Sequence, residues 1–417
     1  MNGNKKQPLV PRLRFPEFRG AVSVLPLDAV ADFVSEKFSV DQLTPAQYVS
    51  TENLLPDFGG ISPATKLPSV SSVTSFRHRD ILVSNIRPYL KKVWQSDMCG
   101  GVSNDVLVIR PTERVGADYL AAILRSDFFI DYVMRGAKGV KMPRGEISMI
   151  REFPVPNPCP EEQQRIADCL SSLDDLIAAE TQKLDTLKTH KKGLMQQLFP
   201  REGETVPRLR FPEFREAGEW KIKSLGTVCT VLQGYGFPET LQGRTEGQYP
   251  FCKVSDISRS VAENGGFLAK AANYVNANDL ATLRAKLIPI GATVFAKIGE
   301  ALRLNRRAFV QCECLIDNNA VGLKAVPGVA NDYFIYLLSQ LINLNDHCGG
   351  AVPSVNKSTL EAIEVVVPEV DEQEKIAASM SYHDELIRNQ EKKLGILKIH
   401  KAGLMQQLFP VLNGEQA

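Results

Sequence analysis

The chain repeats two segments at a domain-sized interval. Residues 10–19, VPRLRFPEFR, recur identically at 206–215, and residues 190–200, HKKGLMQQLFP, recur with one substitution at 400–410. The offsets of 196 and 210 residues are far longer than the period of about 20 to 50 residues in solenoids and propellers. We therefore expect two copies of one design. Because the halves differ almost everywhere between the matched segments, the shared scaffold should present two different surfaces.

The composition sets only broad limits. At 417 residues, with 44% hydrophobic and 23% charged residues, the chain is expected to be a soluble globular protein of two or three domains. The first ten residues lack the apolar core of a secretion signal, and no run approaches about 18 apolar residues, so we expect a cytoplasmic location and no membrane span. The scattered cysteines include one close pair, Cys312 and Cys314, with no second pair to complete a metal site. We expect reduced thiols and no metal.

Each half ends in a long stretch without proline. Both stretches follow a Pro-rich segment and a cluster of acids, which is a helix-start signal. We predict helices from about 161 to 198 and from about 371 to 408, each roughly 57 Å long. Both carry a seam with alternating spacings of four and three, as in a coiled coil, interrupted by polar residues that include Lys191 and Lys401. The apolar seam residues are Ile166, Leu170, Leu173, Ile177, Leu184, Leu187, Leu194, Leu198, Ile376, Met380, Ile387, Leu394, Leu397, Leu404 and Leu408.

The charge gradient along both helices predicts how they pair. Each helix is acidic in its first half and basic in its second half. A parallel pair would place acid beside acid, whereas an antiparallel pair places each acidic half against a basic half. The alternative is that the gradient merely complements each helix macrodipole. We predict an antiparallel, pseudo-two-fold pair that holds the variable regions at opposite ends. DNA has local two-fold symmetry of the same kind.

The two variable regions are predicted to be α+β domains with small sheets. Short apolar runs at 81–83, 106–109 and 292–295 are typical of strands, and residues 118–134 and 331–343 have helical patterns. The predicted organisation is a first α+β domain at 1–158, a helix at 159–200, a second α+β domain at 201–368, and a helix with a tail at 369–417.

Basic and amide side chains gather in loops of both regions. Residues 135–144 hold four bases and two glycines without an acid, and residues 233–237 read Gln-Gly-Tyr-Gly-Phe. Such side chains reach phosphates and base edges. For each residue alone, a solvated surface charge is the alternative, and the Gly-Tyr-Gly-Phe loop could instead be a tight turn with core aromatics. The predicted DNA-binding residues are Arg77, Arg79, Arg87, Lys91, Lys92, Lys138, Lys141, Arg144, Gln233, Tyr235, Lys253, Lys297, Arg303, Arg306 and Arg307.

Catalytic signatures are absent from the sequence. The Gly234-x-Gly236 pair lacks the third glycine of a dinucleotide loop, and no GxxxxGK[ST] occurs. Residues 157–160, Asn-Pro-Cys-Pro, are not the Asn-Pro-Pro-aromatic signature of adenine methyltransferases, and no convincing nuclease pair follows Asp57. We predict a binding scaffold without catalytic residues.

The repeated motifs carry a family resemblance. With its duplicated RFPEF segments, its EEQQRI and DEQEKI helix starts and its KKGLMQQLFP and KAGLMQQLFP helix ends, the chain closely resembles the DNA specificity subunit of type I restriction-modification systems over essentially its whole length. Residues 48–53, 80–88 and 251–257 look like stretches that recur in that family's recognition domains.

The resemblance implies a function and partners. Each of two target-recognition domains would read one half of an asymmetric bipartite site, and the helices would set the length of the unread spacer. Two methyltransferase subunits with S-adenosylmethionine would dock on the helices, and two restriction subunits using ATP and Mg would add cleavage, so this chain would hold no cofactor of its own. The alternatives are a stand-alone enzyme of nucleic acid, such as a nuclease with a cryptic site, and a coiled-coil adaptor without DNA contact.

Overall fold

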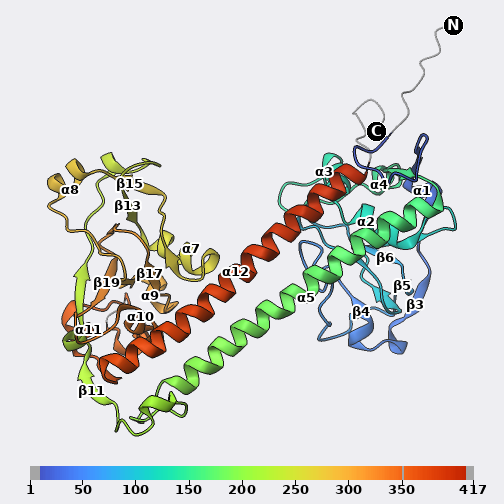
Figure 1. Cartoon of the computed structure of the whole chain (residues 1–417). Coiled ribbons are helices and arrows are strands. Elements are labelled where there is room, and N and C mark those ends of the chain that lie inside the picture. The colour runs from blue at the N-terminus through green and yellow to red at the C-terminus, as the bar shows by residue number, and fades with distance from the viewer. Residues whose placement is uncertain (1–9, 350–351, 410–417) are drawn as a thin grey trace. The chain divides into compact units, whose positions relative to one another are not determined.

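The computed structural model describes residues 10–349 and 352–409. The start of the predicted first domain, residues 1–9, and the predicted tail, residues 410–417, lie outside the described residues. The chain divides into two compact units, Met1–Glu180 with Leu394–Ala417 (unit 1) and Thr181–Lys393 (unit 2). Each unit therefore combines one variable region with one end of each long helix, α5 (Pro160–Leu198) and α12 (Val370–Leu408) (Figure 1).

The described part of unit 1 contains ten strands and short helices besides the ends of α5 and α12. In chain order these elements are β1 (Ser23–Pro26), α1 (Leu27–Val30), β2 (Ala31–Phe33), β3 (Lys37–Ser39), η1 (Val40–Gln42), η2 (Pro45–Gln47), β4 (Tyr48–Val49), β5 (Ser72–Phe76), β6 (Ile81–Ser84), η3 (Pro88–Leu90), β7 (Val93–Gln95), β8 (Gly100–Val102), β9 (Val106–Pro111), α2 (Ala117–Leu124), α3 (Asp127–Arg135), α4 (Ile147–Arg151) and β10 (Pro154–Asn157).

Unit 2 likewise contains ten strands in its described part. Its elements are η4 (Pro212–Phe214), β11 (Lys221–Ser224), α6 (Leu225–Val228), β12 (Cys229–Gln233), η5 (Glu239–Leu241), β13 (Tyr249–Cys252), α7 (Val254–Glu263), β14 (Phe267–Leu268), β15 (Asn273–Val275), α8 (Ala277–Leu283), β16 (Thr293–Ala296), α9 (Glu300–Arg303), β17 (Ala308–Val310), β18 (Leu315–Ile316), β19 (Ala320–Ala325), α10 (Asp332–Leu341), η6 (Leu344–His347), α11 (Lys357–Ala362) and β20 (Glu364–Val367).

The principal sheets of the two units share a strand order. Unit 1 has β2-β9-β6-β7, and unit 2 has β12-β19-β16-β17 with β14 as a fifth strand. The inner strands β6 and β16 are buried along their whole length, which explains why three of the four residues in each are apolar. Each unit also has a smaller sheet, β3-β5-β8-β4 in unit 1 and β15-β13-β18 in unit 2. Different sequences thus build corresponding sheets.

The chain enters and leaves each principal sheet through a two-stranded pair. β1 pairs antiparallel with β10, and β11 pairs antiparallel with β20. The first residue of the following short helix then donates its backbone N–H across the pair, from Leu27 to Phe153 O at 2.8 Å and from Leu225 to Ile363 O at 2.7 Å. The long helix begins a few residues after the second strand of each pair. The helix starts are thereby fixed to the sheets.

The structure confirms most of the predicted elements. α5 and α12 begin and end within one residue of the predicted bounds, and both have two acids in the first turn. The three strand predictions correspond to β6, β9 and β16, and α10 lies within the helical pattern predicted at 331–343. The helical pattern predicted at 118–134 is also confirmed, but it forms two helices, because α2 ends at Leu124 and Ser126 caps α3 by accepting a hydrogen bond from Phe129 N.

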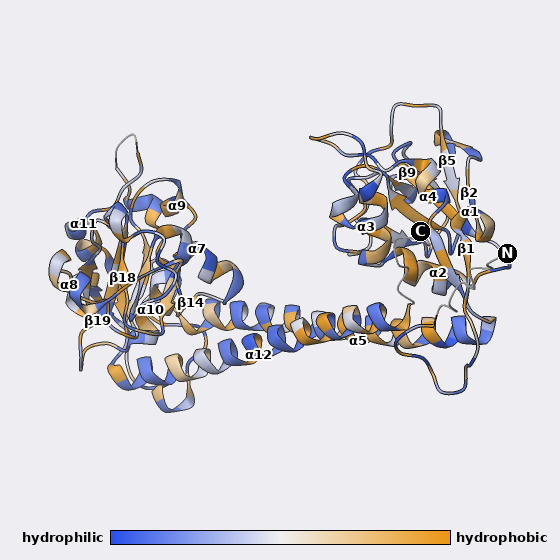
Figure 2. Ribbon diagram, turned by 90° about the horizontal axis from the view of Figure 1, so that it is seen from above, coloured by the Kyte–Doolittle hydropathy of each residue, from blue (hydrophilic) through white to orange (hydrophobic). Residues whose placement is uncertain are grey.

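The ends of the long helices belong to the cores of the units. In unit 1, Ile166, Leu170 and Leu408 pack with α2 and α3, and in unit 2, Leu198 and Ile376 pack with α6 and α10. Figure 2 shows apolar segments within each globular region and mixed apolar and polar residues along both helices. All fifteen predicted seam residues are buried or half-buried.

No helix in the described parts of the chain is long and apolar enough to cross a membrane.

Candidate nucleic-acid interface

The duplicated Arg-Phe-Pro segment holds the start of a long helix in each unit. Arg14 donates from Nε and Nη2 to the two carboxylate oxygens of Glu162, both at 2.7 Å. Arg210 binds Glu372 in the same way at 2.8 and 2.7 Å. The side chains of the two glutamates are only 1% and 3% exposed. A buried carboxylate requires such a partner, and the planar guanidinium satisfies both of its oxygens at once.

The same segment also contacts the end of the other long helix. Leu13 N donates to Gln407 O within unit 1, and Leu209 N donates to Gln197 O within unit 2, both at 2.9 Å. Since both matched sequence segments take part in these bonds, their recurrence reflects a repeated tertiary contact.

The lysines that interrupt the predicted seam form ion pairs between the helices. In unit 2, Lys191 Nζ lies 2.5 and 2.6 Å from the two carboxylate oxygens of Asp384, and the Tyr333 hydroxyl also donates to this carboxylate. In unit 1, Lys401 Nζ lies 2.5 Å from Asp174 Oδ1. Burial lowers the pKa of Lys401, and the hydrogen bond to Asp174 partly offsets this effect. Both seam lysines are therefore paired within the helix contacts.

In unit 1, the structure brings together Arg87, Lys138, Lys141 and Arg144. Lys138 and Arg144 exchange both backbone hydrogen bonds, at 3.0 and 2.9 Å, and thereby close a hairpin, which we call the basic hairpin (residues 138–144). Arg87 N donates to the carbonyl of Pro143 at 2.8 Å. The basic hairpin therefore lies beside the loop that follows β6.

The charged side chains of this surface differ in their pairing. Lys138 lies 2.8 Å from Glu146, and this hydrogen bond lowers the pKa of the glutamate. Arg144 lies 3.1 Å from Asp105. Arg87 and Lys141 are exposed and form no ion pair with a described residue. They can accept an anion without giving up an internal ion pair.

Lys91 and Lys92 lie at the far end of the same loop. The Lys91 ammonium is 2.6 Å from Asp127 on α3, and this hydrogen bond raises the pKa of the lysine. Lys92 donates to Thr51 O at 2.6 Å. Both lysines are half-buried and hold neighbouring segments together.

Left-handed backbone at non-glycine residues is concentrated near this loop. Asp57, Phe58, Arg87 and Lys91 have φ values of 52°, 58°, 51° and 54°. The N–H groups of Asp57 and Phe58 donate to the carbonyls of Leu90 and Lys91, which connects the two segments. Each such conformation costs on the order of 1–3 kcal/mol and persists where neighbouring contacts fix it, commonly at binding sites.

Arg77 and Arg79 lie apart from the basic hairpin. They occupy the turn before β6, whereas Arg87 follows β6. Arg77 pairs with Glu36 at 3.2 Å and Arg79 pairs with Asp118 at 2.5 Å. The predicted basic set of unit 1 therefore divides between the two ends of β6.

Two backbone hydrogen bonds that hold the loop after β6 in unit 1 have counterparts at the loop after β16 in unit 2, and we call this arrangement the backbone frame. In unit 1, Asn85 N donates to Asp105 O at 2.8 Å and Gly145 N donates to Asn85 O at 3.2 Å. The corresponding bonds in unit 2 run from Lys297 N to Asn319 O at 2.8 Å and from Val355 N to the carbonyl of Lys297 at 2.9 Å.

Different side chains occupy this frame in unit 2. Lys297 Nζ donates to Gln233 Oε1 at 3.1 Å, so two predicted residues meet. Arg303 is exposed at the end of α9, 3.5 Å from Glu300, and Arg306 is half-buried in the following turn.

The Gly-Tyr-Gly-Phe loop is largely a packing element. Phe237 stacks on the buried Phe251 with centroids 3.9 Å apart. The Tyr235 hydroxyl accepts a hydrogen bond from Lys286 N at 2.9 Å, and Lys253 lies 5.0 Å over the Phe237 ring. The structure therefore favours the alternative of a turn with core aromatics.

Arg307 requires a correction. It is 4% exposed, and its guanidinium lies 4.5 Å over the Phe295 ring. Nη2 donates to Asn305 Oδ1 at 3.0 Å and to Ile342 O at 3.1 Å, and burial lowers the pKa of Arg307 to about 10. Arg307 therefore has a structural role in place of the predicted DNA contact. Arg306 and Arg307 are adjacent, and the sequence alone does not reveal which of them points inward.

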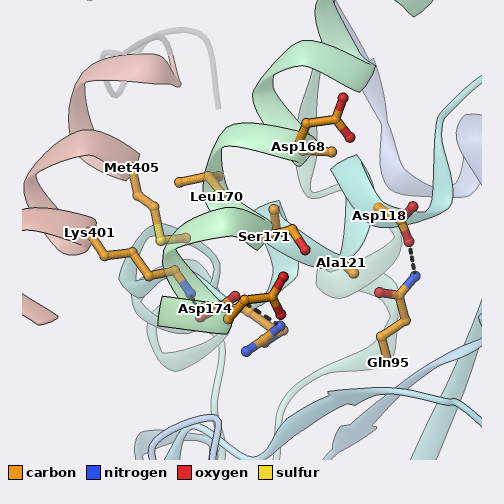
Figure 3. Close-up of a pocket in the computed structure, with 13 residues that line it drawn as sticks. Gln95, Asp118, Ala121, Asp168, Leu170, Ser171, Asp174, Lys401 and Met405 are labelled. Atoms are coloured by element: carbon orange, nitrogen blue, oxygen red, sulfur yellow. Dashed lines mark hydrogen bonds and ion pairs between the residues drawn. The ribbon is translucent and has the colours of Figure 1, made fainter. Parts of the chain in front are cut away.

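A pocket of about 310 Å³ lies beside the helices in unit 1 (Figure 3). Figure 3 shows the Lys401 ammonium directed at Asp174 and the Gln95 amide directed at Asp118. These polar groups bind one another, and no group of three or more His, Cys, Asp or Glu side chains in the described ranges is arranged to hold a metal. The pocket gives no reason to assign a reaction.

Sequence reasoning missed the acids that pair with the seam lysines. A signal was present, because Asp174 and Asp384 are separated by 210 residues, as are Lys191 and Lys401.

Comparisons with known proteins agree with this architecture. The family model described as type I restriction modification DNA specificity domain matches residues 80–189 and 217–397. The type I restriction enzyme MjaIX specificity subunit of Methanocaldococcus jannaschii is 24% identical over 317 residues, which cover 74% of this chain and 72% of the relative. The putative MjaX specificity subunit of the same organism is 25% identical over 317 residues, covering 73% and 70%.

Solved structures share the fold. The crystal structure of a type I restriction-modification system S subunit from M. genitalium has a TM-score of 0.61 at 13% identity and covers 97% of this chain and 100% of that chain. A chain from a structure on complex assembly and conformational transition of the type I R-M system has a TM-score of 0.57 at 19% identity, covering 93% and 97%. Since the family model matches more than half of the chain, this protein belongs to the family of type I restriction-modification DNA specificity subunits.

Proposed function

We propose that this chain is the non-catalytic DNA-recognition subunit of a type I restriction-modification complex. The variable region within 1–158 reads one half of an asymmetric bipartite site, and the region within 201–368 reads the other half. The repeated backbone frame around the loops after β6 and β16 supports this proposal most directly. Two domains that recognise different DNA sequences can share one backbone arrangement if their side chains differ. Phosphate contacts position a protein on DNA, whereas side-chain contacts to the bases specify the sequence.

The proposed DNA contacts are the predicted residues that lie on or near these frames. Exposed lysine and arginine side chains in a loop supply the salt-dependent, sequence-independent part of DNA binding. We leave out Arg77, Arg79 and Arg307, because the first two lie at the other end of β6 and the third is buried. The proposed set is Arg87, Lys91, Lys92, Lys138, Lys141, Arg144, Gln233, Lys297, Arg303 and Arg306, with Tyr235 and Lys253 in supporting positions.

The helices at 159–200 and 369–408 are proposed to form an antiparallel coiled coil that sets the spacer between the half-sites. In unit 2, Lys188 pairs with Glu391 and Lys191 pairs with Asp384, so the partner number falls as the residue number rises. This order supports opposite chain directions. The pseudo-two-fold symmetry is supported by the repeated lysine–aspartate pair in unit 1.

The helices are also the proposed docking site for two methyltransferase subunits, to which two restriction subunits are added. S-adenosylmethionine, ATP and Mg would be bound by those partners. Four exposed apolar side chains on the helices, of the kind that partner proteins cover, support a docking role. They are Leu176, Tyr382, Ile396 and Ile399.

Reconstitution tests the proposal. The pure chain, the cognate methyltransferase subunits and the assembled complex are each incubated with genomic DNA and S-adenosylmethionine, and methylated positions are mapped. We expect methylation at a bipartite motif by the complex alone. Cleavage or methyl transfer by the pure chain would instead support a stand-alone enzyme. A complex that assembles but shows no salt-dependent DNA binding would support an adaptor.

The spacer function has its own test. Inserting one helical turn, about 5.4 Å, into both α5 and α12 at seam-matched positions should lengthen the mapped spacer by one or two base pairs. A spacer of unchanged length would exclude the helices as the ruler.

A further inference from the structure

The basic hairpin ends in an apolar tip. Val140 is fully exposed, at 104% of its reference area, and Met142 is 48% exposed. They lie between Lys138 and Arg144, which pair at the base of the hairpin, and flank the exposed Lys141. Apolar side chains at the most exposed point of a basic loop are costly in water, and they are expected where a partner covers them.

Backbone hydrogen bonds hold the residues on either side of the hairpin tip in place. Besides the paired Lys138 and Arg144, the buried Pro143 accepts a hydrogen bond from Arg87 N at 2.8 Å. Gly139 has a φ of +103°, a conformation that favours glycine, and a Cβ there would lie 3.2 Å from Met142 O. The turn is thus specified by the sequence, and the exposure of Val140 follows from it.

Unit 2 presents an apolar residue at the corresponding place. Val352 is 59% exposed and precedes Pro353, as Met142 precedes Pro143. Pro353 O accepts a hydrogen bond from Gly299 N at 2.8 Å, which matches the bond from Arg87 N in unit 1. The surrounding sequences differ, so the shared apolar residue is a second and independent observation.

The chemistry of the grooves suggests what such a tip contacts. The major groove admits a two-stranded ribbon, and its apolar group is the 5-methyl of thymine. Side chains that wedge between base steps are typically Phe, Leu, Ile, Met or Pro. Val140 is more exposed than Met142 in unit 1, and Val352 is the exposed apolar residue described in unit 2. Valine is short and β-branched, and suits a surface contact with a methyl group better than insertion.

We propose that Val140 and Met142 contact the 5-methyl groups of thymine in the first half-site, while Lys141 and Arg144 contact the flanking phosphates. This inference rests on the proposed DNA-recognition function and adds a specificity-determining contact. Under this proposal, the apolar contacts of the hairpin tip contribute binding free energy that does not depend on salt. The basic side chains around the tip contribute the salt-dependent part.

A double-substitution experiment on protein and DNA tests the inference. The assembled complex binds duplexes of the mapped site in which each thymine of the first half-site is replaced in turn by uracil, which lacks only the methyl group. We expect wild type to lose about four-fold in affinity at one or more positions, the effect of exposing one methyl-sized group. The V140S/M142S variant should bind the thymine duplex more weakly and show no such sensitivity.

Matched variants separate this contact from general effects. The slope of log affinity against log salt should be unchanged in V140S/M142S, because no charge is altered. K141A should lower the slope and retain the sensitivity to uracil. I147S, which changes another exposed apolar residue of unit 1, should match wild type, and unfolding transitions of all variants should coincide.

Three results would overturn the inference. These are equal uracil effects in wild type and V140S/M142S, wild-type affinity of V140S/M142S, and a first half-site made of G·C pairs alone. A wild-type complex without salt-dependent DNA binding would instead overturn the proposed function, and the inference with it.

Discussion

Lys191 and Asp384 form an ion pair across the two long helices of unit 2, with the ammonium 2.5 and 2.6 Å from the carboxylate oxygens. The side chains are 17% and 8% exposed. The pair recurs in unit 1 as Lys401 and Asp174, although the seam is otherwise largely apolar. A polar pair in such a seam contributes little net stability compared with apolar packing but disfavours other registers, since a shifted helix would leave a buried charge without a partner.

Replacing Lys191 by alanine should lower the free energy of unfolding by about 3 kcal/mol, because the buried Asp384 would keep only the Tyr333 hydroxyl as a hydrogen-bond partner among the described residues. Urea unfolding of the full chain measures the loss. Lys192→Ala, which removes an exposed lysine one position away, is the control and should have almost no effect. A loss in K191A no larger than in K192A would mean that the pair does not hold the helices.

Replacing Lys401 by alanine should have a smaller effect, about 1 kcal/mol. Asp174 is 34% exposed, so solvent screens it, and Arg125 remains 3.6 Å away. The same urea titration compares the two variants, with the exposed Lys398→Ala as control. A larger loss of stability in K401A than in K191A would show that solvent exposure does not determine how much these ion pairs contribute to the free energy of unfolding.

Replacing Arg210 by lysine should destabilise the chain by about 2 kcal/mol. The ammonium cannot reproduce the two parallel hydrogen bonds to Glu372, whose carboxylate is buried. The matched substitution Arg208→Lys changes an exposed arginine of the same segment and should be neutral. Thermal unfolding of both variants measures the difference, and equal transitions would contradict a structural role for the recurrent motif.

Replacing Lys141 by alanine should reduce the slope of log affinity against log salt by about 0.9, the value for one neutralised phosphate. Arg77→Ala should leave the slope unchanged, since Arg77 lies before β6 and is paired with Glu36. Titrations of the assembled complex with DNA at several salt concentrations supply both slopes. A reduced slope in R77A together with an unchanged slope in K141A would place the interface at the other end of β6.

The periodic parts of the fold were the most predictable from the sequence. The long helices are marked by acids at their starts, a mostly apolar seam at alternating spacings of four and three, and Phe-Pro at their ends, and the buried strands by short apolar runs. These signals are local, so they are readable without tertiary structure. The division of residues 118–134 into two helices was missed, although Ser126 followed by Asp127 is itself an N-cap signal.

The placement of the candidate DNA-binding residues could not be predicted from the sequence. Arg306 and Arg307 are adjacent in sequence, yet only Arg307 packs on Phe295 in the interior. Loops separated by more than 50 residues in sequence, such as those of Arg87 and Arg144, meet through backbone hydrogen bonds that carry no residue signature. Tertiary contacts decide such placements, and a single sequence does not encode them in any local pattern.

Exchange of one variable region tests the central claim most directly. Residues 21–158 are replaced by the equivalent region of another specificity subunit, the complex is assembled with the same methyltransferase subunits, and the methylated motif is mapped. We expect one half-site to change while the other half-site and the spacer stay the same. A motif that changes in both halves, or in neither, would contradict two independent readers on a shared scaffold.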